Sequence, residues 1–64
     1  MMGRDSASYL TDANSAFVDE DYDRALELYS QAVLADSSNA ESYVKRSATY
    51  HKLGLHQQAF DDAQ

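Results

Sequence analysis

The 64-residue sequence contains no cysteine, no proline and no tryptophan. Without cysteine it can form neither a disulfide nor a thiolate metal site, so the crosslinks that stabilise many very small domains are excluded. No purely apolar run exceeds four residues, whereas a helix needs about 20 apolar residues to span a membrane. No apolar segment of a signal peptide follows Met1. The sequence therefore predicts a soluble, intracellular protein.

Basic residues are also scarce: five Lys and Arg stand against eleven Asp and Glu, and the net charge is -6. This charge repels nucleic-acid backbones and anionic lipids, so neither nucleic acid nor membrane is an expected partner. Four of the acids fall within residues 19–23. A calcium loop of the EF-hand type that began at Asp19 would need Gly and Glu where Arg24 and Ser30 stand. We interpret the cluster as a solvated corner before a helix, where carboxylates face the positive end of the helix dipole.

Apolar residues recur at three- and four-residue steps through most of the sequence, which is the pattern of amphipathic helices. The pattern predicts helices over about residues 6–18, 22–35 and 40–54. Gly54 suits a left-handed stop for the third helix. The segment "QQAFDDAQ" at residues 57–64 is then predicted to begin a fourth helix.

Polar residues at the predicted helix starts indicate how the helices are capped. Asp19 or Asp21 is available as the N-cap of the second helix. Ser38 and Glu41 have the S-x-x-E spacing of a capping box at the start of the third helix. The inner side of the third helix is predicted to carry Tyr43, Val44, Ser47, Tyr50 and His51.

The predicted helices repeat at a fixed spacing. Tyr9 and Tyr43 lie 34 residues apart, as do Ala25 and Ala59. Helix-turn-helix units with this period are typical of the tetratricopeptide repeat. The stretch "DYDRALELYSQAV" followed by "SSNAESYVKRSATYHKLG" resembles that family, and the resemblance extends over nearly the whole chain.

The resemblance implies an all-α fold of tetratricopeptide helix-turn-helix hairpins, a fragment of a right-handed α-solenoid. One repeat is expected at about residues 6–39, and a second, incomplete repeat at about 40–64. The sequence departs from the residue types that the family prefers at Asp12, Arg46, Ala16 and Ser37. Ala25 keeps the small residue that lets the two helices of a hairpin approach closely.

Within this family, the stretch "SAFVDEDYDRALELYSQAVLADSSNAESYVKRSATYHKLG" is most similar to the N-terminal repeat domain of the suppressor-of-G-two-allele-of-Skp co-chaperones. That resemblance implies a protein-protein interaction scaffold in an Hsp90-associated co-chaperone that is linked to ubiquitin-ligase complexes. The implied partners are the Hsp90 system, a Skp-type ubiquitin-ligase subunit and a second copy of the chain. The implied location is the cytoplasm, with the nucleus as a second compartment.

The alternative is a carboxylate-clamp module that binds the acidic C-terminal tails of Hsp70 or Hsp90, since "NAESYVKRSATY" resembles the second repeat of that class. Of its ligand positions, Asn14 keeps the clamp residue, but Leu10 replaces a Lys and Lys45 replaces an Asn. The missing ammonium removes a charge-assisted hydrogen bond of about 1.5–3 kcal/mol, which disfavours a clamp. A third interpretation is a structural cap of a longer array with no ligand of its own.

Position in the repeat predicts which residues line the concave, protein-binding groove, formed by the first and third helices. The first helix is expected to contribute Leu10, Asn14, Phe17 and Val18. The third helix is expected to contribute Val44, Lys45, Ala48, His51 and Lys52.

Other residue types do not form a reactive arrangement in the sequence. His56 and Asp61 are five residues apart, which does not place them on one helix face, so no metal site is expected. The G-x-S-x-G motif of a serine hydrolase is absent. We therefore expect no catalytic residue, no cofactor and no enzyme activity, and we interpret the five Tyr mainly as packing residues.

Overall fold

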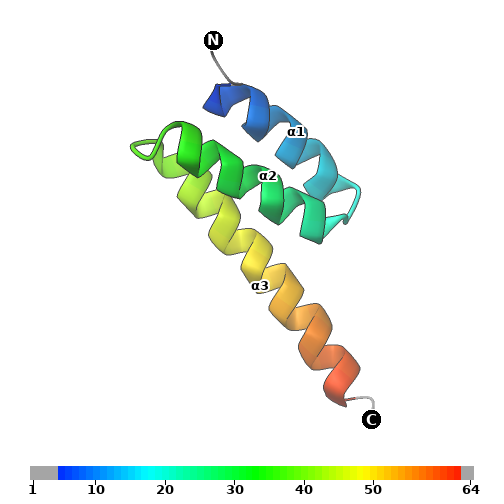
Figure 1. The fold of residues 1–64 in the computed structure, drawn as a ribbon. Helices are drawn as coiled ribbons and strands as arrows, with labels where there is room; N and C mark the ends of the chain where they lie inside the picture. The colour runs from blue at the N-terminus through cyan, green and yellow to red at the C-terminus, as the bar shows by residue number, and fades with distance from the viewer. Residues whose placement is uncertain (1–4, 63–64) are drawn as a thin grey trace.

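The computed structural model describes the backbone of residues 5–62 and the side chains of residues 5–54. Three helices make up the described chain: α1 (Ser6–Val18), α2 (Tyr22–Ala35) and α3 (Ala40–Asp62). Helices α1 and α2 form an antiparallel hairpin, and α3 packs against α2 and continues beyond the hairpin (Figure 1). The all-α class is confirmed, and the bounds of the first two helices agree with the prediction. No helix of the described chain is both long and apolar enough to cross a membrane.

The corner between α1 and α2 closes with two backbone hydrogen bonds. The N–H of Glu20 donates to the carbonyl of Phe17 at 3.0 Å, and the N–H of Asp21 donates to that of Ala16 at 2.9 Å. This pair of bonds is the Schellman motif, which requires a left-handed residue just after the helix. Glu20 is that residue, with φ of 63°. The acidic stretch is thus a tight helix-helix corner, as the sequence predicted.

Glu20 occupies a backbone conformation that glycine adopts far more easily, because a Cβ atom clashes in the left-handed region. We expect Glu20→Gly to raise the free energy of unfolding by about 0.5–1 kcal/mol, after allowing for the greater freedom of glycine in the unfolded chain. Thermal and urea melts compare the variant with the parent, and Glu20→Ala, which keeps the Cβ, is the control. Equal stability of the Gly and Ala variants would contradict the assignment of strain to this corner.

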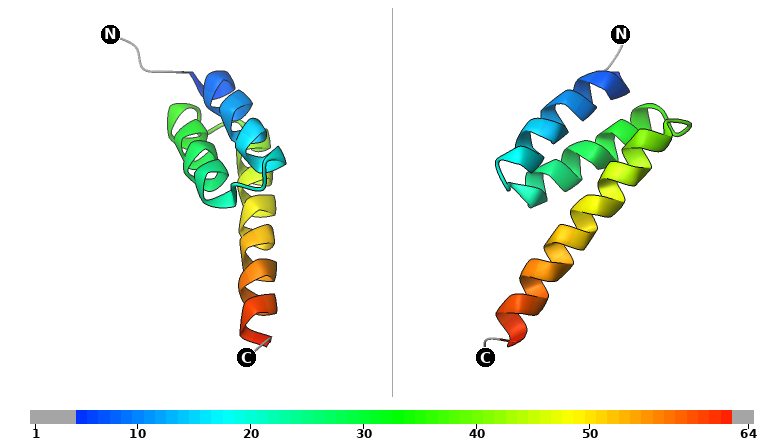
Figure 2. Two further views of the ribbon diagram at one scale, coloured as in Figure 1. Left: turned by 90° about the vertical axis from the view of Figure 1, so that its right-hand side faces the viewer. Right: turned by 180° about the vertical axis from the view of Figure 1, so that it is seen from behind.

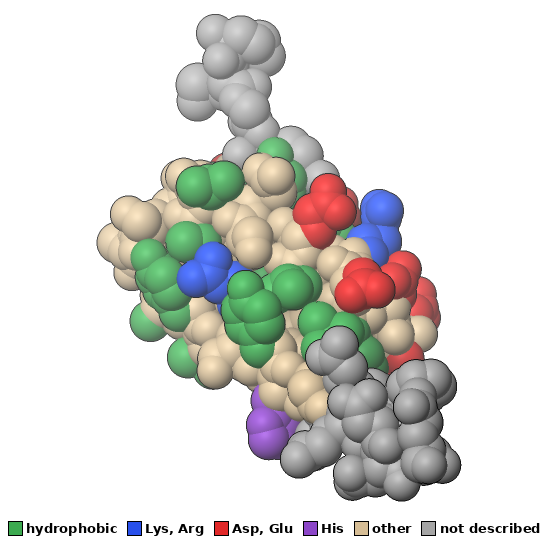
Figure 3. Space-filling model, turned by 60° about the horizontal axis from the view of Figure 1, so that its bottom comes forward, with side chains coloured by type: hydrophobic (Ala, Val, Ile, Leu, Met, Phe, Trp, Pro, Cys, Tyr) green, Lys and Arg blue, Asp and Glu red, His purple; other side chains and the backbone are tan. Residues whose placement is uncertain are grey.

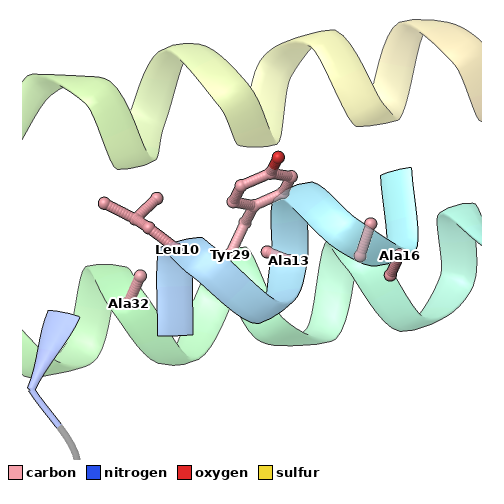
Figure 4. Close-up of a cluster of buried hydrophobic side chains, with 6 residues drawn as sticks. Leu10, Ala13, Ala16, Tyr29 and Ala32 are labelled. Atoms are coloured by element: carbon pink, nitrogen blue, oxygen red, sulfur yellow. The ribbon is translucent and has the colours of Figure 1, made fainter. Parts of the chain in front are cut away.

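Small residues let α1 and α2 approach closely. The core consists of Leu10, Ala13 and Ala16 from α1 and Ala25, Tyr29 and Ala32 from α2. Figure 4 shows the Tyr29 ring rising from α2 past α1, with its hydroxyl directed toward α3. At the corner, the rings of Phe17 and Tyr22 meet edge to face, with centroids 5.2 Å apart. The four alanines therefore set the spacing of the hairpin, and Tyr29 fills the volume between the helices.

An aspartate caps the start of α1, and the cap at the start of α3 differs from the prediction. The Asp5 carboxylate accepts from the N–H of Ser8 at 2.9 Å. At α3, the side-chain oxygen of Asn39 accepts from the N–H of Glu41 at 3.0 Å. The Ser38–Glu41 capping box is therefore wrong, and Asn39 is the residue that caps α3.

Ser38 instead forms hydrogen bonds with Asp36, two residues before it. Its N–H and its hydroxyl both donate to the carboxylate of Asp36, at 3.1 Å and 2.6 Å. These two bonds lower the pKa of the Asp36 carboxyl, because they stabilise its charged form. The N-cap of α2 is Asp21, whose side chain makes no capping hydrogen bond.

Helix α3 contacts α2 through a different face from the one predicted. Ser42 and Thr49 are fully buried. The predicted inner residues are exposed instead, including Tyr43, Val44 and Tyr50 with exposed fractions of 42%, 64% and 57%. Ser47 and His51 are exposed as well. The predicted inner side of α3 is therefore wrong, because the face that packs on α2 carries Ser42 and Thr49 instead.

The predicted helix end at Gly54 is also wrong, because α3 continues without interruption to Asp62. Gly54 does not have positive φ, and a Cβ added to it would meet nothing within 4 Å. A helical glycine costs only about 1 kcal/mol relative to alanine, and no proline follows to force a stop. Figure 2 shows the second half of α3 extending past the hairpin. The side chains of residues 55–64, including the predicted packing residue Ala59, lie outside the description.

Candidate protein-interaction surface

The groove residues predicted on α1 differ in exposure. Leu10 retains an exposed fraction of 7% and belongs to the core, so it offers almost no surface to a ligand. Asn14 and Phe17 are half-buried. Val18 is exposed at the end of α1, where it borders the acidic corner. Of the four, Asn14 and Val18 retain groups that a partner could contact, and Leu10 contributes through packing.

The groove residues predicted on α3 are all exposed. They are Val44, Lys45, Ala48, His51 and Lys52. Lys45 and Lys52 lie within one helix turn of Ser42 or Thr49, the fully buried residues of α3, and are exposed beside them. The backbone carbonyl of Lys45 accepts a hydrogen bond from the buried Thr49 hydroxyl at 2.8 Å. This exposed side is the part of the predicted groove that is accessible in the structure.

Asn14 is held by a hydrogen bond from the core. The Tyr29 hydroxyl donates to the side-chain carbonyl oxygen of Asn14, which joins α1 and α2. Burial raises the pKa of Tyr29, and the negative charge of Glu41 on α3 raises it further. Tyr29 therefore marks the point where all three helices meet. Because the carbonyl end of the Asn14 amide is fixed at Tyr29, the NH2 end is directed away from Tyr29 as a potential donor.

An aromatic and basic face on α3 was missed by sequence reasoning. Tyr43 and Tyr50 are exposed, and the guanidinium carbon of Arg46 lies 5.7 Å from the centre of the Tyr43 ring, a cation–π contact. The spacing of these residues, i, i+3 and i+7, placed them on one helix face, but it did not show that the face is uncovered. We refer to Tyr43, Arg46 and Tyr50 as the tyrosine face. Figure 3 shows hydrophobic and basic side chains next to one another at the surface.

Among the described side chains, charge differs between the α1–α2 hairpin and the first part of α3. Residues 5–36 carry eight acids and one base, whereas residues 40–54 carry one acid and three bases. Four of these acids, Asp19, Glu20, Asp21 and Asp23, lie at the α1–α2 corner, and the bases Lys45, Arg46 and Lys52 lie on α3. The exposed side of α3 is therefore the part of the molecule that favours an acidic ligand, despite the negative net charge.

An open hollow of about 370 Å³ lies at the α1–α2 corner. Its lining comes from both helices and their connection: Asp12, Ser15, Ala16, Asp19, Asp21 and Arg24. Within the described side chains, no group of three or more His, Cys, Asp or Glu could hold a metal ion. The His56–Asp61 pair lies outside the described side chains.

Comparison with known proteins gives several relatives for this segment. The chain is 47% identical over 53 residues to "Protein SGT1 homolog" of Dictyostelium discoideum, covering 83% of this chain and 14% of the relative. A protein of the same name from Oryza sativa subsp. japonica is 45% identical over 51 residues, covering 80% of this chain and 14% of the relative. "Heat shock protein STI1" of Saccharomyces cerevisiae is 38% identical over 56 residues, covering 86% of this chain and 10% of the relative.

These relatives all contain tetratricopeptide repeats. No family model matches the chain. No solved structure matches it either. The chain spans about one seventh of the length of the SGT1 homologues that it matches. The helical hairpin and the identity of 38–47% over about 50 residues together identify the chain as a tetratricopeptide-like domain.

Proposed function

We propose that the chain is the protein-interaction domain of an Hsp90-associated co-chaperone that is linked to Skp-type ubiquitin-ligase complexes. The observation that carries the proposal is the 47% identity to a protein named SGT1 homolog over 83% of the chain. The exposed basic side of α3 supports it, because an accessible patch of mixed apolar and basic residues suits a protein partner. The proposed location is the cytoplasm and the nucleus.

Binding in this proposal depends on the charge of α3. Lys45 and Lys52 lie seven residues apart on α3, which is about two helix turns, and both side chains are exposed. We expect Lys45→Glu/Lys52→Glu to weaken binding of purified Hsp90 or a purified Skp-type subunit at least tenfold at low salt, because two attractive contacts become repulsive. Isothermal titration calorimetry with each purified protein gives the affinity. Arg24→Glu, an exposed basic residue on α2, is the matched control and should leave the affinity unchanged.

Both proteins are tested because the two partners are separate parts of the proposal. The proposal is supported for a partner if that protein binds the parent chain, binds the Lys45→Glu/Lys52→Glu variant more weakly, and binds the Arg24→Glu variant as well as the parent. If neither protein binds the purified chain up to a concentration of about 1 mM, an affinity of only about 4 kcal/mol, the proposal fails. The chain would then act as a structural cap of a longer repeat array.

A carboxylate-clamp module is the second proposal, and the fixed Asn14 amide favours it. The Tyr29 hydroxyl orients this side chain, and Lys45 on α3 supplies a positive charge. The buried position of Leu10 counts against the proposal, since it leaves no cation at that site. The test compares the affinity for short acidic peptides that have a free C-terminal carboxylate with the affinity for the same peptides amidated at the C-terminus. A clamp requires the free carboxylate, whereas a surface that reads acidic side chains binds both forms.

A further inference from the structure

The S-x-x-E spacing of Ser38 and Glu41 has no capping role in the structure, so another role for this pair has to be considered. Asn39 caps α3 in place of Ser38. Both Ser38 and Glu41 have exposed side chains. The sequence contains ten serines and threonines, and Ser38 is the one that has an acid three residues after it. The motif therefore distinguishes one hydroxyl from all the others in the chain.

Ser38 lies in the exposed turn that joins α2 to α3 (Figure 1). Within the described residues, Ser37 and Ser38 are the serines and threonines that lie outside a helix. The turn begins with extended backbone at Asp36, where φ is -151° and ψ is 92°. Surface turns change conformation more easily than helices, which suits a segment that must enter the groove of a modifying enzyme. The distinguished hydroxyl is therefore also an accessible one.

The charge around Ser38 has one sign. Residues 25–44 contain three acids and no base. Two of these acids flank the turn, with Asp36 two residues before Ser38 and Glu41 three residues after it. An enzyme whose substrate groove is basic is attracted to such a segment, whereas an enzyme that reads arginine before the acceptor finds none there.

The first turn of α3 has to open for Glu41 to enter the same groove as Ser38, and this opening loses few stabilising contacts. Ala40 and Glu41 are exposed. The buried side chain in this turn is Ser42, whose hydroxyl has no hydrogen-bond partner within the described chain. A buried hydroxyl without a partner is unfavourable, and opening returns it to water. The N-terminal end of α3 is therefore a part of the fold that opens locally.

We propose that Ser38 is a phosphorylation site for a serine kinase that selects an acid three residues after the acceptor. The kinase transfers the γ-phosphoryl group of ATP to the Ser38 hydroxyl oxygen. The new oxygen–phosphorus bond forms as the bond to ADP breaks, and the hydroxyl proton leaves to a base of the kinase. Ser37 has Ala40 at the corresponding position and is not the acceptor. The site does not depend on the proposed co-chaperone role.

The phosphate changes the turn, because it removes a hydrogen bond and adds negative charge at the same atom. The Ser38 hydroxyl donates to the Asp36 carboxylate at 2.6 Å, and the phosphoryl group replaces the hydrogen of that bond. A phosphoserine carries about -1.5 to -2 charges at pH 7, so attraction between the two side chains becomes repulsion. The bonds from Ser38 lower the pKa of the Asp36 carboxyl, and this pKa should rise after phosphorylation.

Phosphorylation of the purified chain with magnesium and ATP tests the site. The probes are a purified acid-selective serine kinase and, for comparison, a purified arginine-selective serine kinase. We expect the first kinase to add a phosphate that tandem mass spectrometry places on Ser38, and the second to leave Ser38 unmodified. NMR titration of the phosphorylated chain should show the Asp36 carboxyl protonating at a higher pH than in the parent.

Three variants separate the acceptor from the acid that is read. Ser38→Ala should lower the initial rate of phosphorylation by the acid-selective kinase at least tenfold. Glu41→Gln keeps the shape of the side chain but removes its charge, and it should lower the rate at least fivefold. Ser37→Ala, the control, removes the neighbouring exposed hydroxyl and should keep the parent rate. Circular dichroism confirms that the three variants keep the helix content of the parent.

A synthetic peptide of residues 33–44 serves as the unfolded reference, and four results overturn the proposal. Phosphate on a residue other than Ser38 shows that the motif does not select the acceptor. A Glu41→Gln variant that reacts at the parent rate shows that the acid is not read. A peptide that is phosphorylated while the folded chain is not shows that the turn stays closed to the kinase. Failure of both the peptide and the chain to react shows that the segment is not a substrate.

Discussion

Replacement of Tyr29 by Ala is expected to remove a large share of the stability of the domain. Tyr29 is almost fully buried, and its ring fills the volume between α1, α2 and α3. Removing a buried aromatic ring costs about 3–5 kcal/mol, through lost transfer free energy and the cavity that remains. A domain of this size has a total stability of only about 3–10 kcal/mol. Circular dichroism and urea melts measure the loss.

Tyr29→Phe separates the hydroxyl from the ring. This variant keeps the packing but leaves the carbonyl oxygen of the half-buried Asn14 without its donor, and we expect a loss of about 1 kcal/mol. Leu34→Ala, at an exposed position on the same helix, is the control and should cost little. A Tyr29→Ala variant as stable as the Leu34 control would show that Tyr29 does not anchor the core.

The same residue gives a pH dependence whose sign follows from its pKa. Burial and the charge of Glu41 raise the pKa of Tyr29 in the folded chain above the ordinary value of 10.0. The folded state therefore holds the phenol proton more tightly than the unfolded state does. The stability from this group is fully present below pH 10 and is lost as the pH rises through the folded pKa. Tyr29→Phe should fall less steeply above pH 10 than the parent.

The fold of the first repeat could be predicted because several local signals agree there. The helix period, the turn residues and the small residue at Ala25 all indicate one hairpin, and the bounds of α1 and α2 follow from them. The residue that caps α3 could not be predicted in the same way, because Asn39, Ser38 and Asp36 can each accept a capping hydrogen bond. The competition between neighbouring polar side chains, which sequence spacing alone does not rank, is decided by the backbone of the turn.

The second repeat shows where local signals are insufficient. Gly54 is compatible with both a helix interior and a left-handed stop, so the choice depends on whether residues 55–62 gain contacts by folding back. The exposed faces depend on the same choice, which is why the predicted inner side of α3 was wrong. The groove assignment used position in the repeat, and position does not report burial; Leu10 is the residue where this matters, since it lies in the core.

The close approach of α1 and α2 gives the second large stability effect. Ala25 is fully buried in the core and faces α1 in the hairpin. A leucine there adds three carbons where neighbouring side chains already fill the space, so the helices must separate or adopt strained rotamers. We expect Ala25→Leu to lower the free energy of unfolding by about 1–3 kcal/mol, and urea melts at dilute protein concentration measure the change.

Ala35→Leu is the matched control for this substitution, because Ala35 is exposed at the last position of the same helix. The two variants add the same atoms and change helix propensity equally, so their difference isolates overpacking between α1 and α2. Overpacking should also separate the rings of Phe17 and Tyr22 at the corner, which a change in their near-ultraviolet circular dichroism would report. If Ala25→Leu melts like Ala35→Leu with an unchanged aromatic signal, the site has room for a larger residue, and the small residue at this repeat position does not set the helix spacing.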